Sequence, residues 1–388
     1  MKVRSAKILT LAPSQSAFRT ASAALEEMGN YCAISKKAQA PAAGKKVLWV
    51  RTAAGPVIGF GHLRRTLILA RMLRSSVMPL FLLDSGDRWS QEQVQRDRFG
   101  YEVFEPGKPW LNHTSPSAIL IDTRQEQGLA WLLAEARRRA VPVVSIHDLG
   151  LVPLASDFVI DGSIRPFAGG FSPEGTNYCA GLSYLVLDPD YASCRRRAKR
   201  IRREIGKVVI NLGGGDSGRY FRKVLEGLRW TGLSLDVVGV PGFARWGQEE
   251  LARECWHPLR FRWAGQGESI AELVSRADLA ITAGGLAAYE ALCVGTPLCA
   301  LSYDRPQRMT VKALAEAGLC LDLGYGKSLS PSRLSSQYCR LAENHELRRK
   351  LASRGRRTID GHGARRVSRI LRRILMKRAT EGARAKSR

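Results

Sequence analysis

The chain has 388 residues, of which 45% are hydrophobic and 25% are charged, a globular composition with enough length for two cores of ordinary domain size. This composition excludes a chain that is disordered throughout. Lysine and arginine total 61 against 35 aspartates and glutamates, and the formal net charge of +26 predicts attraction to an anionic partner. Nucleic acid, an acidic membrane face and a phosphorylated small molecule all satisfy that condition.

Cysteine usage and hydropathy indicate the compartment. The 8 cysteines are dispersed, form no CxxC pair and have no histidine nearby at metal-ligand spacing. No apolar run approaches the roughly 18 residues of a membrane span, and the N-terminus lacks the compact apolar core of a secretory signal. We therefore expect a soluble, reduced, cytoplasmic protein without a zinc site.

Residues 1–45 are rich in alanine and serine and include the linker-like run KKAQAPAAGKK, so we expect a flexible extension or an over-extended translation start. From Val47 onward, short strand-like runs alternate with amphipathic helical stretches, as in a parallel sheet with helices on both faces. The first half is expected to hold a helix over 128–140 and strands at 47–50, 79–83, 101–105, 118–122, 141–146 and 157–161.

Between residues 167 and 206 this alternation stops, in a glycine-rich passage followed by the basic run CRRRAKRIRREIGK, both poor strand formers. We therefore predict an α/β protein with two doubly wound, Rossmann-like domains, 46–195 and 196–360, and a basic C-terminal helix and tail over 361–388. The two domains should face each other across a cleft, because such pairs bind ligands between the carboxyl ends of their strands. The expected strands of the second half are 207–212, 235–240, 259–265, 278–284, 297–302 and 319–323.

The run INLGGGDSGRYFRKVLEGL places Gly213, Gly214 and Gly215, followed by Asp216, between a strand and a helix. Glycines let backbone N–H groups approach a phosphate closely, and a helix N-terminus adds partial positive charge. The run matches neither a Walker A loop nor GxGxxG, so a flexible turn is the alternative interpretation.

The run LAITAGGLAAYEALCVGTPL repeats this arrangement with Gly284 and Gly285, and its short helix carries Glu290. Glu290 lies about a turn and a half into the helix, so its carboxylate could accept two hydroxyls of a ribose whose phosphates sit at the helix start. The alternative is a solvated glutamate on an exposed helix face.

The run GPVIGFGHLRRTLILARML places His62 between a glycine turn and a basic helix. The helix macrodipole disfavours an imidazolium at that end, so His62 should stay neutral at pH 7 and could act as a general base. The alternative is a histidine that only caps the helix or hydrogen-bonds a ligand.

Taken together, these segments resemble the PseG/SpsG family. VRTAAGPVIGFGHLRRTLILARML, INLGGGDSG, ITAGGLAAYEALCVGTPL and DRPQRMTVKALAEAGLCLDLG occur in the family's order and approximate spacing, and GLSYLVLDPDY resembles its segment ahead of the interdomain linker. The family comprises UDP-sugar hydrolases of pseudaminic acid biosynthesis and predicted glycosyltransferases of spore coat polysaccharide synthesis, and it is similar to MurG-type transferases. The resemblance covers about Val47 to Gly324 and implies a GT-B fold.

On this resemblance, His62 corresponds to the histidine that activates water at the anomeric carbon, Glu290 to the ribose-binding acid, and Gln307 to a glutamine of the nucleotide-sugar cleft. It implies a UDP-sugar substrate with no cofactor and no metal. The main expectation is a PseG-like hydrolase in surface polysaccharide or nonulosonic acid-type sugar biosynthesis. The alternative is an inverting SpsG- or MurG-like glycosyltransferase that passes the sugar to a hydroxyl. The candidate substrate-binding residues are Arg51, Gly59, Gly61, Arg65, Asp122, Gly213, Gly214, Gly215, Asp216, Gly284, Gly285, Glu290 and Gln307.

The chain departs from the hydrolases in its sugar-facing half. Ala53 stands where they usually have aspartate, Thr123 and Arg124 stand in place of a His-Tyr pair, and Pro306 replaces an asparagine ahead of the glutamine. The loss of one carboxylate and the gain of one guanidinium predict an altered, acidic sugar.

The C-terminal run ARRVSRILRRILMKR carries an apolar stripe among arginines. Such a helix could lie on an anionic membrane, giving peripheral contact at the inner membrane face. We favour a helix that packs across both domains, as GT-B chains end. The stripe consists of Val367, Ile370, Leu371, Ile374 and Leu375.

Two further functions stay open. A non-catalytic nucleotide-sugar binding protein would fit the altered positions of the first half. Nucleic-acid binding would fit the charge, but the chain lacks aromatic interleaving and any reader motif, so no specific nucleic acid is expected. We expect a monomer or a weak dimer.

Overall fold

The computed structural model describes residues 45–386 apart from gaps at 56–58, 108–114, 124–127, 148–153, 155, 167–176, 216–217 and 243–247. Of residues 377–386 it describes the backbone alone. The predicted extension over residues 1–45 lies almost wholly outside the described residues and stays a prediction. None of the helices within the described ranges is both long and apolar enough to cross a membrane.

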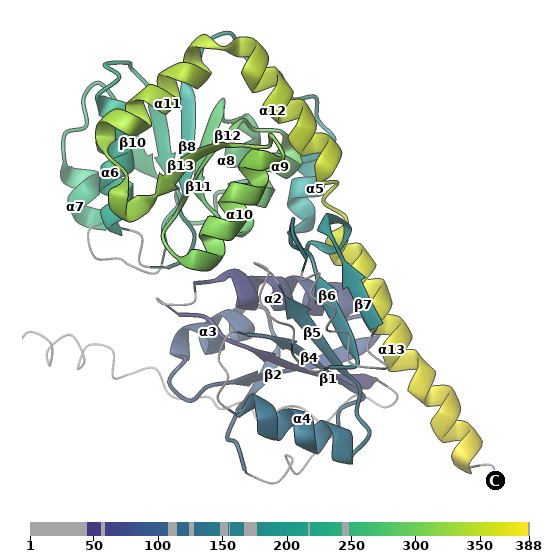
Figure 1. The fold of residues 1–388 in the computed structure, drawn as a ribbon. Helices are drawn as coiled ribbons and strands as arrows, with labels where there is room; N and C mark the ends of the chain where they lie inside the picture. The colour runs from purple at the N-terminus through teal and green to yellow at the C-terminus, as the bar shows by residue number, and fades with distance from the viewer. Residues whose placement is uncertain are drawn as a thin grey trace, which may run out of the picture. The chain divides into compact units, whose positions relative to one another are not determined.

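Two parallel sheets organise the described chain (Figure 1), and all the strands expected from the sequence are present in them. The first sheet has the order β3-β2-β1-β4-β5-β6-β7, and the second has the order β10-β9-β8-β11-β12-β13. The first consists of β1 (Lys46–Thr52), β2 (Val77–Leu83), β3 (Gly100–Val103), β4 (Ala118–Asp122), β5 (Val143–His147), β6 (Phe158–Asp161) and β7 (Asn177–Ala180). The second consists of β8 (Lys207–Asn211), β9 (Asp236–Gly239), β10 (Arg260–Trp263), β11 (Leu279–Ala283), β12 (Leu298–Ser302) and β13 (Leu321–Tyr325).

Helices connect the strands and cover the sheets. Those of the first half are α2 (Gly61–Leu73), α3 (Arg88–Arg96) and α4 (Leu129–Arg138), followed by the short η1 (Leu182–Tyr184). The remainder are α5 (Pro189–Arg195), α6 (Gly218–Arg229), α7 (Gln248–Arg253), α8 (Ile270–Arg276), α9 (Leu286–Val294), α10 (Arg305–Glu316), η2 (Gly326–Ser328), α11 (Pro331–Glu343), α12 (His345–Thr358) and α13 (Gly363–Lys386).

Each sheet reverses its winding direction once. In the first sheet the reversal falls between β1 and β4, because β2 and β3 are added on one side of β1 and β4 to β7 on the other. In the second sheet it falls between β8 and β11, because β9 and β10 are added on one side of β8 and β11 to β13 on the other. In doubly wound sheets the crevice at such a point, at the carboxyl ends of the strands, is where ligands bind. The topology therefore predicts that the loops after β1, β8 and β11 surround any site.

Burial on both faces explains the near-continuous apolar strands of the second sheet. Val208 and Ile210 face one core, together with Phe221 of α6, whereas Val209 between them faces another, together with Leu292 of α9. This period of two follows from the pleat of a strand. In contrast, β7 was not predicted, because its residues are exposed or half-buried at the sheet edge and form no apolar run.

The predicted domain boundary at residue 195 needs correction, because α5 packs against α8 and α9 of the second half. Tyr191 of α5 is fully buried, and Leu187 ahead of it lies in the same core. Asp188 caps α5 by accepting a hydrogen bond from the amide of Asp190 at 3.1 Å. The chain therefore joins the second half before this helix and not after it.

The C-terminal helix packs on protein. Its stripe residues Val367 and Leu371 are fully buried against α2 in the core of the first half, whereas α12 packs on α9 of the second half. The favoured interpretation, terminal helices that pack across both halves, is thus confirmed for the described residues. The apolar stripe is not available to a membrane, although Arg365 and Arg369 on the opposite side are exposed.

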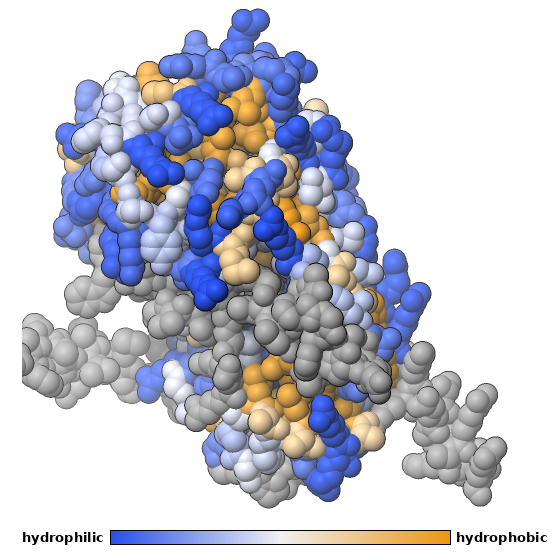
Figure 2. All heavy atoms as spheres, viewed as in Figure 1, coloured by the Kyte–Doolittle hydropathy of each residue, from blue (hydrophilic) through white to orange (hydrophobic). Residues whose placement is uncertain are grey.

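The basic surface is partly neutralised by acids. On the face seen in Figure 2, hydrophilic side chains surround apolar areas in both halves and do not form one continuous stripe. Arg71 lies 2.7 Å from Asp97 on the first half, and Arg308 lies 2.6 Å from Asp322 on the second. Exposed pairs of this kind add little stability, about 0.2–1 kcal/mol each.

Candidate active site

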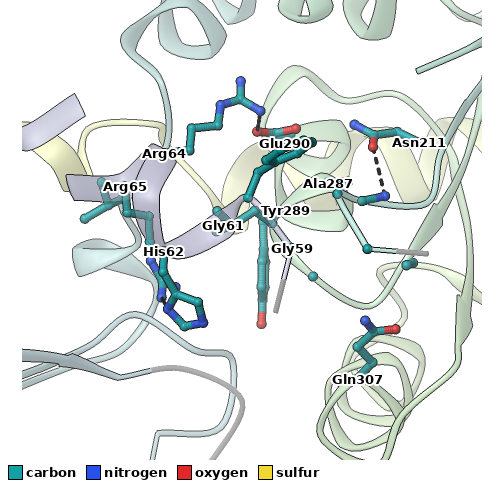
Figure 3. A pocket seen from close by; sticks show the side chains of 18 of the residues that line it. Gly59, Gly61, His62, Arg64, Arg65, Asn211, Ala287, Tyr289, Glu290 and Gln307 are labelled. Carbon is teal, nitrogen blue, oxygen red and sulfur yellow. Dashed lines mark hydrogen bonds and ion pairs between the residues drawn. The ribbon is translucent and has the colours of Figure 1, made fainter. Parts of the chain in front are cut away.

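The three glycine-containing turns that follow β1, β8 and β11 come together around one pocket (Figure 3). Each turn stands at the carboxyl end of a strand beside a reversal of winding, as the topology predicts. Of the predicted residues, the lining includes Gly59, Gly61, His62, Arg65, Gly213, Gly214, Gly215, Gly285, Glu290 and Gln307. Residues far apart in the sequence thus share one site.

The first turn is closed at its base by two backbone hydrogen bonds. The amide of Gly59 donates to the carbonyl of Gly55 at 2.7 Å, and Gly59 has a φ of 75°, in the left-handed region that favours glycine. Helix α2 starts directly afterwards, with Phe60 as its N-cap and no side-chain capping bond. His62 therefore stands in the first turn of α2 without capping it.

The imidazole of His62 is held by a buried carboxylate from the neighbouring strand. Nδ1 of His62 lies 2.6 Å from Oδ1 of Asp122, which ends β4 and is fully buried. Arg65, one turn along α2, donates to both oxygens of Asp122, from Nε at 2.9 Å and from Nη2 at 2.7 Å. The three side chains form a compact network, with His62 at its pocket end.

The carboxylate at the centre of this network is ionised. Burial alone would raise the pKa of Asp122, but attraction to Arg65 and to His62 outweighs it and holds that pKa below its ordinary value of 3.8. Because the charged carboxylate accepts from Nδ1–H of His62, Nε2 is left as the basic nitrogen. His62 can therefore take a proton from a group in the pocket.

The turn after β8 lets its backbone lie close to the first glycine turn. The amide of Gly213 donates to Oδ1 of Asn211 at 3.1 Å, and Gly213 has a φ of 83°. Gly214 touches Phe60 of the first turn so closely that a Cβ added to it would overlap the aromatic ring. Asp216, predicted as part of this turn, lies outside the described residues.

The two glycines of the turn after β11 have different roles: Gly284 allows close packing, and Gly285 lines the pocket. A Cβ on Gly284 would lie 2.6 Å from the carbonyl oxygen of Gln307, so this glycine lets α10 pack against the turn. Gly285 faces open space at the start of α9. A helix N-terminus preceded by small residues presents backbone N–H groups to an anion.

Glu290 is not a solvated surface glutamate, because its side chain is only 3% exposed. Its Oε1 lies 3.1 Å from Nη1 of Arg64, which comes from the first turn of α2 in the other half. This ion pair and a second contact, from the amide of Ile164 to the hydroxyl of Tyr289 at 3.3 Å, join α9 to the first half around the pocket.

Gln307 is fixed at the start of α10. Asp304 caps this helix by accepting from the amide of Gln307 at 2.7 Å, and Pro306 occupies its first turn, where its fixed φ suits a helix. Oε1 of Gln307 accepts from the amide of Tyr303 at 3.3 Å. The proline that replaces the family's asparagine therefore serves the helix start.

No protein-family model matches the chain. It is 32% identical over 219 residues to the spore coat polysaccharide biosynthesis protein SpsG of Bacillus subtilis (strain 168), a match that covers 56% of this chain and 64% of that protein. The chain therefore spans less than two thirds of the length of this curated relative.

Solved structures show the fold. Acinetobacter baumannii MurG superimposes with a TM-score of 0.61 and 13% identity, covering 85% of this chain and 99% of that one. The chain has the GT-B fold and is similar to SpsG. Anabaena Alr3699/HepE in complex with UDP and glucose also matches this chain, with a TM-score of 0.52 and 15% identity over 84% of it and 99% of the other chain.

Besides Gly284, two predicted binding residues do not line the pocket, Arg51 and Asp122. Arg51 is fully buried, donates to the carbonyl of Leu82 at 3.2 Å and to Asp84 at 2.7 Å, and packs on Phe104. Asp122 lies behind His62 and acts on it. In the register of β1 and β4, Arg51 pairs with Ile121 and Thr52 pairs with Asp122, so the side chains of Arg51 and Asp122 lie on opposite faces of the sheet.

The departures from the family pattern have mixed placements. Ala53 is 1% exposed and does not line the pocket, so the loss of a carboxylate there does not change the described lining. Thr123 is half-buried outside the lining, and Arg124 lies outside the described residues. The acidic sugar therefore stays a prediction.

The lining residues that sequence reasoning missed include Arg64, His147 and Tyr289. Arg64 adjoins Arg65, and one more arginine in a basic helix gives no signal of its own. His147 ends β5 at the carboxyl edge, so its place at a strand end could have marked it. Tyr289 stands in an apolar helix, where an aromatic residue is expected to be core.

Proposed function

We propose that the protein is an inverting glycosyltransferase that passes a sugar from UDP to a hydroxyl acceptor in polysaccharide biosynthesis. The observation that carries this proposal is the pairing of His62 with Asp122 at the end of a pocket walled by glycine turns. Inverting transfer needs one base at the acceptor and donors at the departing diphosphate, and the pocket offers both kinds of group.

In the proposed reaction Nε2 of His62 takes the proton of the acceptor hydroxyl as its oxygen attacks the anomeric carbon. The bond between that carbon and the β-phosphate oxygen breaks, and UDP leaves with the electron pair. Asp122 stabilises the imidazolium that forms. Backbone N–H groups of the turns after β8 and β11, at the starts of α6 and α9, are the proposed donors to the leaving diphosphate.

Glu290 is the proposed acceptor of the ribose hydroxyls, since it lines the pocket on the helix whose start carries Gly285. A uridine diphosphate is proposed because one GT-B neighbour, HepE, is described in complex with UDP and glucose. The link to polysaccharide biosynthesis rests on the name of SpsG.

Hydrolysis, our main expectation from the sequence, differs from transfer in the acceptor alone, because the same base can activate water. The comparisons favour transfer, since the matched relative belongs to spore coat polysaccharide biosynthesis and MurG and HepE share the fold of glycosyltransferases. The pseudaminic acid precursor has no support from them.

The test is UDP release from a panel of UDP-sugars, with and without hydroxyl acceptors. We expect release that depends on an acceptor and that falls about 10²- to 10⁴-fold in His62→Ala, the contribution of a general base. His257→Ala removes an exposed histidine outside the lining and is the matched control. Release without acceptor would favour the hydrolase, and UDP binding without release would favour a binding protein.

A further inference from the structure

Arg64 and Glu290 form an ion pair between the two halves of the site. Arg64 stands two residues after His62 in the first turn of α2, and Glu290 stands on α9 beside the second sheet. Nη1 and Oε1 are 3.1 Å apart, and Figure 3 shows the pair at one side of the pocket, across from Gln307. The carboxylate raises the pKa of the Arg64 guanidinium, which is therefore charged at every working pH.

The two sides of this pair differ in freedom. The side chain of Glu290 is 3% exposed and is fixed within α9, whereas that of Arg64 is 37% exposed. A long, half-exposed arginine can change partner at a small cost in free energy, because its aliphatic chain is flexible and its guanidinium lies near water. Arg64 is therefore the member of the pair that has room to change partner.

The charges of the pocket lining single out Arg64. Among its described residues the cationic side chains are Arg64 and Arg65. Arg65 is 2% exposed and donates to both oxygens of Asp122. If it moved away, the buried carboxylate would lose its counter-charge. Arg64 alone can be given a new anionic partner while its old one, Glu290, is satisfied by other donors.

We propose that Arg64 binds the diphosphate of the donor, exchanging Glu290 for it when the ribose hydroxyls take the Glu290 carboxylate. This inference rests on the proposed function. The two hydroxyls replace the guanidinium as donors to Glu290, and the planar guanidinium binds two phosphate oxygens as a fork. Neither charge is left unpaired at any stage.

The exchange would link donor binding to the base. Because Arg64 and His62 share the first turn of α2, a guanidinium on the diphosphate places His62 relative to the sugar attached to it. It also supplies a positive charge where the leaving group develops negative charge.

Binding of UDP and of uridine to the same variants tests the exchange, since uridine carries the ribose without the diphosphate. We expect Arg64→Ala to weaken UDP binding about tenfold or more, as for the loss of a charge-assisted contact, while uridine binds as well as or better than to wild type. Arg64→Lys keeps the charge and should recover part of the UDP affinity. Arg71→Ala removes a cation from the same helix that pairs with Asp97 away from the pocket, and should change neither affinity.

The same comparison in a Glu290→Gln background separates contact with the diphosphate from support of Glu290. If Arg64 binds the diphosphate, Arg64→Ala still weakens UDP in that background. An effect that vanishes there, an equal loss of uridine and UDP, or no loss of UDP would overturn the exchange while leaving the proposed function intact. A wild-type protein that binds neither ligand would overturn the proposed function as well. Thermal unfolding checks that each variant is folded.

Discussion

The imidazole of His62 and the carboxylate of Asp122 meet where the first sheet reverses its winding, with Nδ1 2.6 Å from Oδ1. The pair depends on topology, because β1 and β4 are neighbours in the sheet and α2 follows β1. Arg65 completes it by neutralising the carboxylate from the same helix as the histidine. The contributions of this pair to activity and to stability can be separated experimentally.

His62→Ala and Asp122→Asn should both lower UDP release, by about 10²-fold or more, because one removes the base and the other its orientation and charge. Their stabilities should differ. His62→Ala leaves the Asp122–Arg65 pair intact, whereas Asp122→Asn leaves a buried guanidinium without its anion and costs about 3–5 kcal/mol. Urea unfolding and UDP release on the same preparations measure both effects. Equal stabilities of the two variants would contradict this account.

The stabilisation by Asp122 should depend on pH in one direction. Its folded pKa lies below 3.8, so the group binds a proton less readily in the folded chain than in the unfolded chain. The stabilisation is therefore fully present above the unfolded pKa and is lost as pH falls through the folded pKa. The difference in unfolding free energy between wild type and Asp122→Asn should be constant from about pH 7 to about pH 5 and shrink below about pH 4. A difference that already shrinks near neutral pH would point to a raised pKa.

Gly214→Ala should force the first two glycine turns apart, because its Cβ would overlap the ring of Phe60. We expect a loss of about 1–3 kcal/mol in stability, the usual cost of overpacking, and weaker UDP binding. Gly86→Ala is the control, since a Cβ there meets nothing within 4 Å. In Phe60→Ala/Gly214→Ala the overlap with the ring is removed, so part of the stability should return. Isothermal titration and urea unfolding follow the two effects.

Much of the fold could be predicted from the sequence because both sheets are buried on two faces. Runs such as 118–122 and 279–283 are apolar throughout and have few alternatives to a central parallel strand. The predictions failed where burial was weak or shared. β7 has no buried run, and α5 was assigned to the first domain although its buried Tyr191 packs on helices that come far later in the chain.

The site could be predicted where chemistry leaves a local mark. Glycines mark turns, and the histidine of GFGH stands in one of them. Side chains defined by a distant partner leave no such mark. Arg64 and Arg65 are adjacent and identical in type, yet one pairs with Glu290 of the other half and the other with Asp122. Arg51 shows the converse, a conspicuous charge on a strand that turns out to be structural.

Arg51→Met should therefore destabilise the protein without changing its UDP affinity. The change removes the 2.7 Å pair with Asp84 and the bond to the Leu82 carbonyl from a fully buried site. Methionine fills similar volume, and Asp84 is 36% exposed and can be hydrated, so we expect a loss of about 2–3 kcal/mol. Urea unfolding measures it, and UDP titration below the transition checks affinity. A large loss of UDP affinity in the folded variant would show that Arg51 contributes to UDP binding.

Substitutions on opposite faces of α13 test what that helix does. Leu371→Asp buries an unpaired carboxylate in the core shared with α2, and we expect it to destabilise the first half by about 3 kcal/mol or more. Arg369→Glu on the exposed face should stay within about 0.5 kcal/mol of wild type. Urea unfolding distinguishes them, and a Leu371→Asp protein as stable as wild type would mean that the stripe is not packed.

Co-sedimentation with anionic vesicles tests whether α13 binds a membrane. Because the apolar stripe is buried, any binding should be electrostatic, so that Arg369→Glu weakens it and high salt abolishes it. Binding that survives high salt would show that the stripe can leave the core.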